Sequence, residues 1–316
     1  MGLVYAQFLR RAGAAVSLLV KPEHAETCGK GFTLHRLRRG GRRDSERIDD
    51  LPIHTSVAGL AERRFDQIWL TVASDAMRQP WLGDVLGPSE DATVVILQPD
   101  LEDRALALES IAEERLVQGL IGFLSFQSPL PQAPLPPEGI AYALLPGMAS
   151  SFDGARAPEI VSLLKRGAFP ARQTHDLVGR SAERSATTVP LIAGLEAAGW
   201  SIPNFVRGPW LPRSIDASKE ALAVVAKHLG RRPTAVRHVL SPLPVRAALA
   251  LAPALTPFDL EAYLGFHFTK VGPQTRLMLE TYERLAKTLA LSSAALHALR
   301  SALEQDAETT PSGATP

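Results

Sequence analysis

Apolar runs alternate with short amphipathic segments over the first half of the chain, and helical periodicity dominates the second half. The runs that predict strands cover residues 15–20, 32–37, 68–72, 93–97, 120–126 and 140–145. Residues 65–72 and 93–97 contain nearly unbroken apolar stretches, so we expect both faces of these two strands to be buried. Strands that alternate with helices are typical of a parallel sheet covered by helices.

The chain opens with Gly2, a helical segment, Gly13 and an apolar strand that ends at Lys21. This order matches the second half of a dinucleotide-binding βαβ unit, in which G-x-G-x-x-G opens the helix. Gly2 takes the position of the last glycine, which lets the helix pack closely on the sheet. Only Met1 precedes it in this sequence, without the two glycines that let backbone approach a pyrophosphate.

Helices are predicted over residues 159–166, 188–198, 218–229, 257–290 and 292–304. Ser218 is a suitable N-cap, Gly230 a suitable stop, and Pro190 fits the first turn of its helix. The sequence therefore predicts an α/β protein. A Rossmann-like parallel sheet domain over residues 1–150 is followed by an all-helical C-terminal domain over residues 151–304, and the polar residues 305–316 predict a disordered tail.

The strand that would precede Gly2 is central in the sheet order 3-2-1-4-5-6. Without it, strands 15–20 and 68–72 each leave bare backbone groups, at about 1–3 kcal/mol for each unpaired buried group. Three explanations stay open at this point. Another segment fills the slot, the sheet closes over it, or the true start lies upstream and encodes an apolar strand and G-x-G.

Composition limits the partners. Lys and Arg number 34 against 33 for Asp and Glu, which gives no electrostatic case for nucleic acid or an anionic membrane. No apolar stretch reaches the roughly 18–20 residues of a membrane span, and the start lacks the order of a signal peptide. A single cysteine, Cys28, excludes an internal disulfide, and the eight histidines form no H-x-x-x-H pair, so we expect no metal site. We therefore expect a cytoplasmic protein that acts on a small molecule.

A glycine pair inside a basic cluster, residues 36–43, predicts an exposed hairpin tip, with attraction of a phosphate-bearing ligand as the alternative. The likeness to a known family begins elsewhere, in four N-terminal stretches with matching order and spacing. These are Gly2-x-x-Tyr5-Ala6, Arg11-Ala12-Gly13, residues 19–25 and Gly31-Phe32-Thr33-Leu34.

Together with residues 66–72 and 94–98, these stretches resemble the ketopantoate reductase family; residues 198–202 and 266–275 resemble a divergent branch of it. The resemblance implies a Rossmann-like domain joined to a helical domain, and reduction of a 2-keto acid by NADPH. It also implies a proton donor, a lysine, that this chain lacks in the only fitting alignment. Ser181, Ser185 and Val189 occupy the three functional positions there.

Two further departures concern the ends of strands. Ala73-Ser74 stands where the family has a lysine, and Pro99-Asp100 follows Gln98 in place of Asn-Gly. If the sheet is doubly wound, Ala73 and Gln98 flank the nicotinamide ribose, because ligands settle beyond the carboxyl ends of parallel strands.

The remaining candidates bind cofactor or substrate. Lys21, a basic residue at a strand end, favours NADP, conditional on an intact phosphate-binding loop; the alternative is a solvated lysine. Arg180 and Arg184 can clamp a substrate carboxylate, but an arginine is always charged and makes a poor acid.

His267, Lys270 and Gln274 share one face of the predicted helix 257–290. Lys270 or His267 can supply the missing acid, and Gln274 can contact substrate; alternatively, this face meets solvent or a partner in a homodimer. Three functions stay open: an NADP-dependent oxidoreductase, a non-catalytic relative that keeps the fold as a binding module, or a truncated product.

Overall fold

The computed structural model describes residues 1–60, 63–88, 91–131, 133 and 136–309. Contacts divide the chain into two compact units. The first comprises Met1–Gln98, Glu102–Val178 and Leu255–Phe258; the second comprises Pro99–Leu101, Gly179–Ala254 and Asp259–Pro316. The boundary expected near residue 150 lies inside the first unit, because β10 (Ser150–Asp153), α5 (Ala157–Arg166) and β11 (Ala171–Gln173) belong to its sheet layer.

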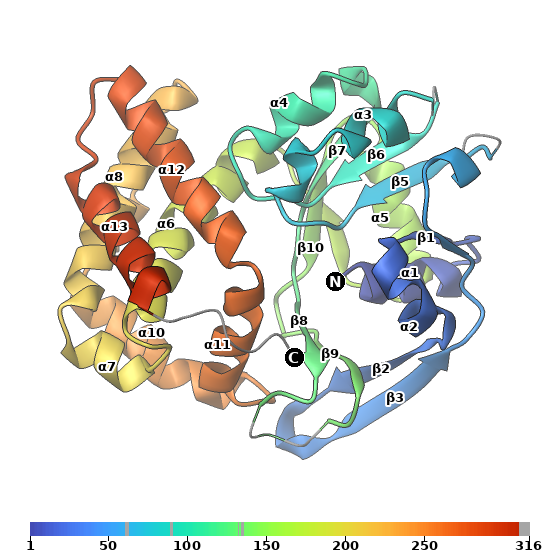
Figure 1. Ribbon diagram of the computed structural model, residues 1–316, viewed down its shortest axis with the longest axis horizontal. Helices are drawn as coiled ribbons and strands as arrows, with labels where there is room; N and C mark the ends of the chain where they lie inside the picture. Colours follow the sequence, from blue (N-terminus) through green and yellow to red (C-terminus); the bar gives the residue numbers. More distant parts are fainter. Residues whose placement is uncertain (61–62, 89–90, 132, 134–135, 310–316) are drawn as a thin grey trace. The chain divides into compact units, whose positions relative to one another are not determined.

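The main sheet of the first unit has five strands in the order β11-β10-β7-β6-β5 (Figure 1). Its parallel part consists of β5 (Gln67–Leu70), β6 (Thr93–Ile96) and β7 (Leu116–Leu120), while β10 runs antiparallel to β7. Every residue of β6 is buried, as predicted. Three residues of β5 are half-buried because β5 is an edge strand, so the prediction of two buried faces is wrong there.

A second sheet has the order β3-β2-β9-β8, with β2 (Phe32–Leu37), β3 (Arg43–Ile48), β8 (Leu124–Ser128) and β9 (Gly139–Ala143). The predicted hairpin tip is confirmed, since β2 and β3 pair antiparallel around Gly40 and Gly41, both with positive φ. The single strand predicted over residues 120–126 is wrong. The chain leaves β7 at Leu120 and enters β8 at Leu124, because Gly122 lies against backbone, where a Cβ would be 2.2 Å from the carbonyl carbon of Ala149.

The slot for a central strand is open. β1 (Leu18–Leu19) pairs in parallel with β4 (Ile53–His54) in a separate two-stranded sheet. Neither β1 nor the outer edge of β5 has another strand partner among the described residues. Among the described residues, no strand fills the slot and the sheet does not close over it. The predicted strand over residues 15–20 shortens to two residues because it has one neighbour.

The helices of the first unit are α1 (Gly2–Arg11), α2 (Ala25–Gly29), α3 (Trp81–Leu86), α4 (Asp103–Leu108) and α5. Helix α1 is anchored by an aromatic cluster. The rings of Tyr5 and Phe8 lie 5.3 Å and 4.9 Å from the ring of Phe169, centroid to centroid. The Tyr5 hydroxyl is 2.9 Å from Ser150 Oγ, and burial raises the pKa of this phenol. The cluster fixes the start of α1 against the sheet.

The second unit is helical, as predicted. Its helices are α6 (Leu177–Ala197), which begins in the first unit, α7 (Ile202–Arg207), α8 (Trp210–His228), α9 (Val236–Val239), α10 (Pro242–Leu255), α11 (Leu260–Lys270), α12 (Gly272–Thr288) and α13 (Ala294–Thr309). Gly230 ends α8 with φ +63°, as expected for a glycine stop. Helix α13 includes residues 305–309, part of the predicted tail, and the remainder, 310–316, lies outside the described residues.

Two helix-end predictions are wrong. Pro190 lies inside α6, and Ser218 lies inside α8 rather than at its start. The fully buried Ser218 hydroxyl is 2.8 Å from the Ser214 carbonyl and 3.0 Å from the Thr187 carbonyl. Ser218 thus serves carbonyls inside two helices, Ser214 on α8 and Thr187 on α6, rather than free amides at a helix start.

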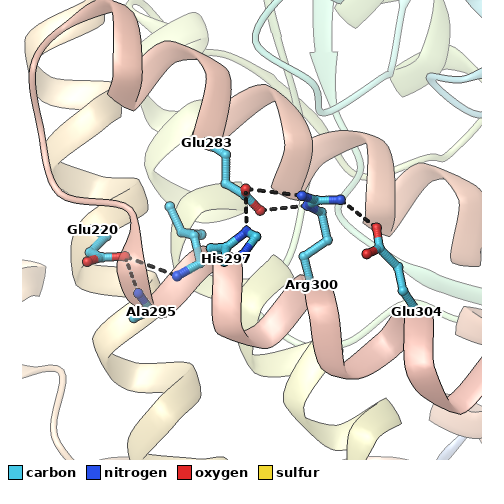
Figure 2. Close-up of polar contacts among 7 residues, drawn as sticks. Glu220, Glu283, Ala295, His297, Arg300 and Glu304 are labelled. Carbon is cyan, nitrogen blue, oxygen red and sulfur yellow. Dashed lines mark hydrogen bonds and ion pairs between the residues drawn. The ribbon is translucent and has the colours of Figure 1, made fainter.

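Helix α13 is fixed to its neighbours through two carboxylates (Figure 2). Glu220 on α8 accepts hydrogen bonds from the backbone amides of Ala295 and Leu296 at 2.9 Å and 3.0 Å, in the first turn of α13. Glu283 on α12 accepts from Arg300 Nε at 2.7 Å. A carboxylate at a helix N-terminus satisfies free amides and complements the helix dipole, so Glu220 acts as a cap supplied from another helix.

We predict that Gly167→Ala destabilises the first unit. A Cβ at Gly167 would lie 2.0 Å from the Phe8 carbonyl oxygen, so α1 and α5 have to separate. Overpacking of this kind costs about 1–3 kcal/mol, measurable by urea unfolding. The matched control is Gly29→Ala, where nothing lies within 4 Å of a new Cβ; an equal loss in the control would contradict this explanation.

Candidate functional site

The start of α1 packs against the carboxyl end of β5. A Cβ on Gly2 would lie 2.6 Å from Thr71 Oγ1, so the close helix packing expected of Gly2 is observed. This contact places the amino end of α1 beside the loop that follows β5. In sheets of this kind, ligands bind beyond the carboxyl ends of the parallel strands. The loops after β5 and β6 are therefore the candidate site of the first unit.

The side chain of Gln98, directly after β6, forms all its hydrogen bonds with backbone groups at the ends of β5 and β6. Its buried side-chain amide donates to the carbonyl oxygens of Leu70 and Val72 at 2.9 Å and 2.8 Å. Its oxygen accepts from the amide of Leu97 at 2.9 Å. The side chain thereby continues the pairing of β5 with β6 beyond the last regular ladder position, and both of its amide hydrogens are used.

Ala73 lies in a turn, and its carbonyl accepts from the amide of Ala76 at 3.1 Å. The neighbouring Ser74 is fully buried, and its hydroxyl donates to Asp103 Oδ2 at 2.7 Å. Arg78 donates to Asp103 Oδ1 at 2.9 Å and to the Ser74 carbonyl at 2.8 Å. An ion pair between the buried Asp103 and the half-buried Arg78 therefore ties the loops after β5 and β6 together at the place where the family resemblance implies a lysine.

Sequence reasoning missed this network. Arg78 and Asp103 are 25 positions apart, and no motif or period joins them. The sequence did contain one indication. Asp103 begins a largely apolar segment shortly after the predicted strand 93–97, and a charged side chain in such surroundings needs a partner. Only the adjacency of the two strand ends identifies that partner.

Lys21 lies just beyond the carboxyl end of β1, with φ −64° and ψ 146°, and caps a short 3₁₀ turn over Pro22–His24. Its side chain is exposed. Its strand-end position is as expected, while its role as a phosphate contact stays a prediction.

Between β1 and β5 the first unit contains a cavity of about 910 Å³. It follows the slot of the central strand, with residues 14–19 on one side and residues 65–72 on the other. Tyr5 and Leu9 of α1 and Trp81 of α3 also line it.

In the second unit, His267 and Lys270 lie on α11, whereas Gln274 lies on α12. The single polar face predicted for these three side chains is therefore interrupted. The break falls at Val271, because Gly272 and Pro273 begin a new helix and Pro at an interior position would remove a helical hydrogen bond.

The surroundings of His267 and Lys270 are aromatic. The His267 ring stacks on Tyr263 with 5.3 Å between centroids and 18° between planes, and Lys270 Nζ lies 4.1 Å from the centre of the Phe266 ring. Each pair is four residues apart on one helix. Sequence reasoning did not single out Tyr263, although its spacing of four residues from His267 was visible.

Burial lowers the pKa of His267 to about 4, and the charge of Lys270 acts in the same direction. Burial also lowers the pKa of Lys270. His267 is therefore neutral near pH 7 and holds no proton to give as an imidazolium. Lys270 stays the better candidate for a general acid, since a lysine with a lowered pKa transfers its proton more readily.

Arg180 and Arg184 both lie on α6 with exposed side chains. Arg184 interacts electrostatically with Tyr263: burial raises the pKa of the Tyr263 hydroxyl, and the guanidinium opposes that rise. Arg184 thus interacts with Tyr263, and Tyr263 in turn stacks on His267. Among the contacts described, Arg180 has no such interaction.

The described residues fit part of a nicotinamide dinucleotide site. They supply the amino end of α1 and Lys21, but not the glycine-rich turn that holds a pyrophosphate. In the described parts of the chain, no group of three or more His, Cys, Asp or Glu residues is placed to hold a metal ion. No described helix is long and apolar enough to cross a membrane.

No family model and no curated protein matches the sequence. Solved structures do. The chain is similar to 2-dehydropantoate 2-reductase from Geobacter metallireducens GS-15, with a TM-score of 0.72, 15% identity and 96% of each chain covered. It is similar to a ketopantoate reductase from Ralstonia eutropha JMP134, with a TM-score of 0.72, 14% identity, and 97% of this chain and 95% of that one covered.

It is also similar to D-mandelate dehydrogenase in a ternary structure with NADH and anilino(oxo)acetate, with a TM-score of 0.70, 14% identity, and 98% and 96% coverage. The chain thus shares its fold, over nearly its whole length, with these reductases and with this dehydrogenase. More particularly, the chain has the ketopantoate reductase fold, as the family resemblance predicted.

We predict that Gln98→Leu lowers stability by about 2–4 kcal/mol. The change leaves the carbonyls of Leu70 and Val72 without their donor, and unpaired buried groups cost about 1–3 kcal/mol each. Urea unfolding measures the loss. Gln79→Leu, at an exposed position, is the control and should stay within about 0.5 kcal/mol of the parent.

Proposed function

We propose that the protein is a nicotinamide-dependent oxidoreductase that reduces a small 2-keto acid or related carbonyl with NADPH. One observation carries the proposal. Over nearly its whole length the chain has the fold of reductases and dehydrogenases, and Gly2 holds α1 against the carboxyl end of β5 as a nucleotide-binding helix requires.

The proposed roles of the residues follow from their chemistry. Lys21 accommodates the 2′-phosphate of NADP, and the backbone at Gly2, Ala73 and Gln98 contacts the cofactor, since the Gln98 side chain is already used. Lys270 gives the proton that neutralises the alkoxide formed by hydride transfer.

The other second-unit candidates hold substrate. Neutral His267 orients it by hydrogen bonding. Arg180, Arg184 and Gln274 bind its carboxylate, a task for which a guanidinium fork is suited. A cytoplasmic location and a homodimer stay predictions from the sequence.

A non-catalytic relative that keeps the fold as a binding module is the second candidate. It is favoured by the buried network of Ser74, Arg78 and Asp103, which occupies the position of an implied active-site lysine. Turnover separates the two candidates. NADPH oxidation with a panel of small 2-keto acids supports the reductase, and nucleotide binding without any turnover supports the binding module.

The test of cofactor choice is Lys21→Glu. We expect the variant to bind NADPH at least about 10-fold more weakly while NADH affinity changes little, because it loses a cation and gains repulsion at the 2′-phosphate. Titration of ligand fluorescence measures both constants. Lys165→Glu reverses an exposed charge on α5 as the control. Absence of binding of either nucleotide to the parent protein would refute the proposal.

The test of the proton donor is Lys270→Met. We expect kcat to fall about 10²–10⁴-fold with KM changed much less, as for loss of a general acid. Lys287→Met removes an exposed lysine from α12 and should leave kcat unchanged. Equal activity of the two variants would remove Lys270 from the mechanism.

A further inference from the structure

Helix α10 is apolar on almost every side, yet it is not buried. Arg246 is the only polar residue among its 14, and the others are alanine, leucine, valine and proline. None of the 14 residues is buried. A helix of this composition is ordinarily enclosed by a protein core or by lipid, so its exposure in the folded chain needs an explanation.

One side of α10 packs on the core of the second unit. Val245 and Leu249, four residues apart, are half-buried against that core. On the opposite side, spacings of three and four residues bring together five exposed apolar side chains. These form the outer face of α10, which consists of Leu243, Ala247, Ala250, Leu251 and Ala254. Leu243 is 77% exposed and Leu251 is 63% exposed, so the outer face is open to contact.

Exposure of large apolar side chains is concentrated at this helix and at α9, which precedes it. Val239 on α9 is 64% exposed. Among the described residues, the four most exposed of the large apolar side chains all lie within residues 239–255. Single exposed apolar residues are ordinary on a protein surface, whereas a group of them marks an interaction site.

The same part of the chain is basic. Residues 221–258 contain five Lys and Arg residues and no Asp or Glu, so the near balance of charge over the whole chain hides a local excess. Arg232 and Arg237 are exposed and have no carboxylate partner among the described residues. Arg246 donates to the Val206 carbonyl at 3.1 Å. Cations alone therefore flank the exposed apolar residues along the chain.

The outer face is too small for a stable protein interface. A helix of 14 residues is about 21 Å long, and packed helices lie about 8–10 Å apart, so contact along one helix covers roughly 200 Å². A stable interface buries about 800 Å² on each partner. A second copy of this chain would also present the same cations, because a two-fold interface uses one patch twice.

A lipid surface has no minimum area of this kind. The strength of binding to it grows with each apolar side chain that enters the boundary between headgroups and acyl chains. Anionic headgroups also attract nearby Lys and Arg residues, which adds to the apolar contribution. An anionic lipid surface therefore complements both the apolar character and the charge of this region.

We propose that α9 and α10 form a docking site for an anionic lipid surface. The outer face of α10 enters the boundary of headgroups and acyl chains, and the helix lies in the plane of the membrane. Its length of about 21 Å is less than the roughly 30 Å of a hydrocarbon core, so it does not span the bilayer. Arg232 and Arg237 bind the headgroups. This inference is independent of the proposed reductase activity, and its test uses no nucleotide.

Sedimentation of the full chain with vesicles measures the binding. One set of vesicles is phosphatidylcholine with phosphatidylglycerol added as the anionic lipid, and the other is phosphatidylcholine alone. We expect at least about 10-fold tighter binding to the anionic vesicles, because each cation near such a surface contributes about five-fold. This difference should shrink as salt is raised, since the headgroup charges are then screened.

Two double variants separate the apolar from the cationic contribution. Leu243→Ser with Leu251→Ser removes apolar area and should weaken binding to the anionic vesicles at least about 10-fold. Arg232→Gln with Arg237→Gln removes two cations and should weaken it to a similar degree. All four side chains are exposed, so Tm should stay close to that of the parent protein.

The matched control for charge is Lys165→Gln with Lys287→Gln. Both lysines are exposed and lie on other helices, α5 and α12. This double variant loses the same number of cations as the arginine pair. We expect it to bind anionic vesicles within about 2-fold of the parent protein, since charge distant from the surface is screened.

A fluorescent label reports insertion directly. In a Cys28→Ser background, Leu251→Cys carries an environment-sensitive dye, and Lys287→Cys carries the same dye as the control. With anionic vesicles, we expect the emission of the label at position 251 to shift to shorter wavelength. Lipids brominated on their acyl chains should quench this label and leave the label at position 287 unchanged.

Tighter binding to anionic vesicles, reduced by both double variants and accompanied by quenching at position 251, supports the proposal. Absence of binding, equal binding to both kinds of vesicle, or binding unaffected by the Leu243→Ser and Leu251→Ser pair overturns it. Dimerisation in light scattering that the same pair abolishes, without vesicle binding, identifies a second copy as the occupant and also overturns the proposal.

Discussion

The need to pair backbone donors and acceptors at the edges of β5 governs the first unit. One edge is satisfied by β6 and is extended by Gln98, whose amide binds two carbonyls beyond the ladder. The other edge faces a cavity of about 910 Å³. The cavity lies along this second edge, and α1 packs at its carboxyl end, where a Cβ on Gly2 would lie 2.6 Å from Thr71 Oγ1.

The side chains at the carboxyl ends of β5 and β6 differ from those that the family resemblance implies. Gln98 and the network of Ser74, Arg78 and Asp103 use polar side chains to bind the two loops to each other. Side chains held in this way have their polar groups already used in hydrogen bonds. In the second unit, burial lowers the pKa of His267 to about 4 and also lowers the pKa of Lys270.

The second unit shows how tertiary contacts override local signals. Ser218 has the composition of an N-cap, yet its hydroxyl serves the carbonyl of Thr187 on a neighbouring helix, near Pro190. Pro190 in turn lies inside α6 rather than at its start, because the helix begins thirteen residues earlier, at Leu177. The amino-acid sequence alone does not indicate that Ser218 bonds to a carbonyl of a neighbouring helix.

The sequence by itself determined the alternation of strands and helices, the buried strand β6, the glycine hairpin tip and the fold family, because these depend on local periodicity and on residues close along the chain. It also indicated an open position in the sheet between the strand that ends before Lys21 and the strand at residues 68–72. Only the tertiary structure decided that no described segment fills that position, that Gln98 pairs with the end of β5, and that Arg78 meets Asp103. Such facts depend on which strand ends and edges become neighbours, and that is settled by packing between residues far apart in sequence.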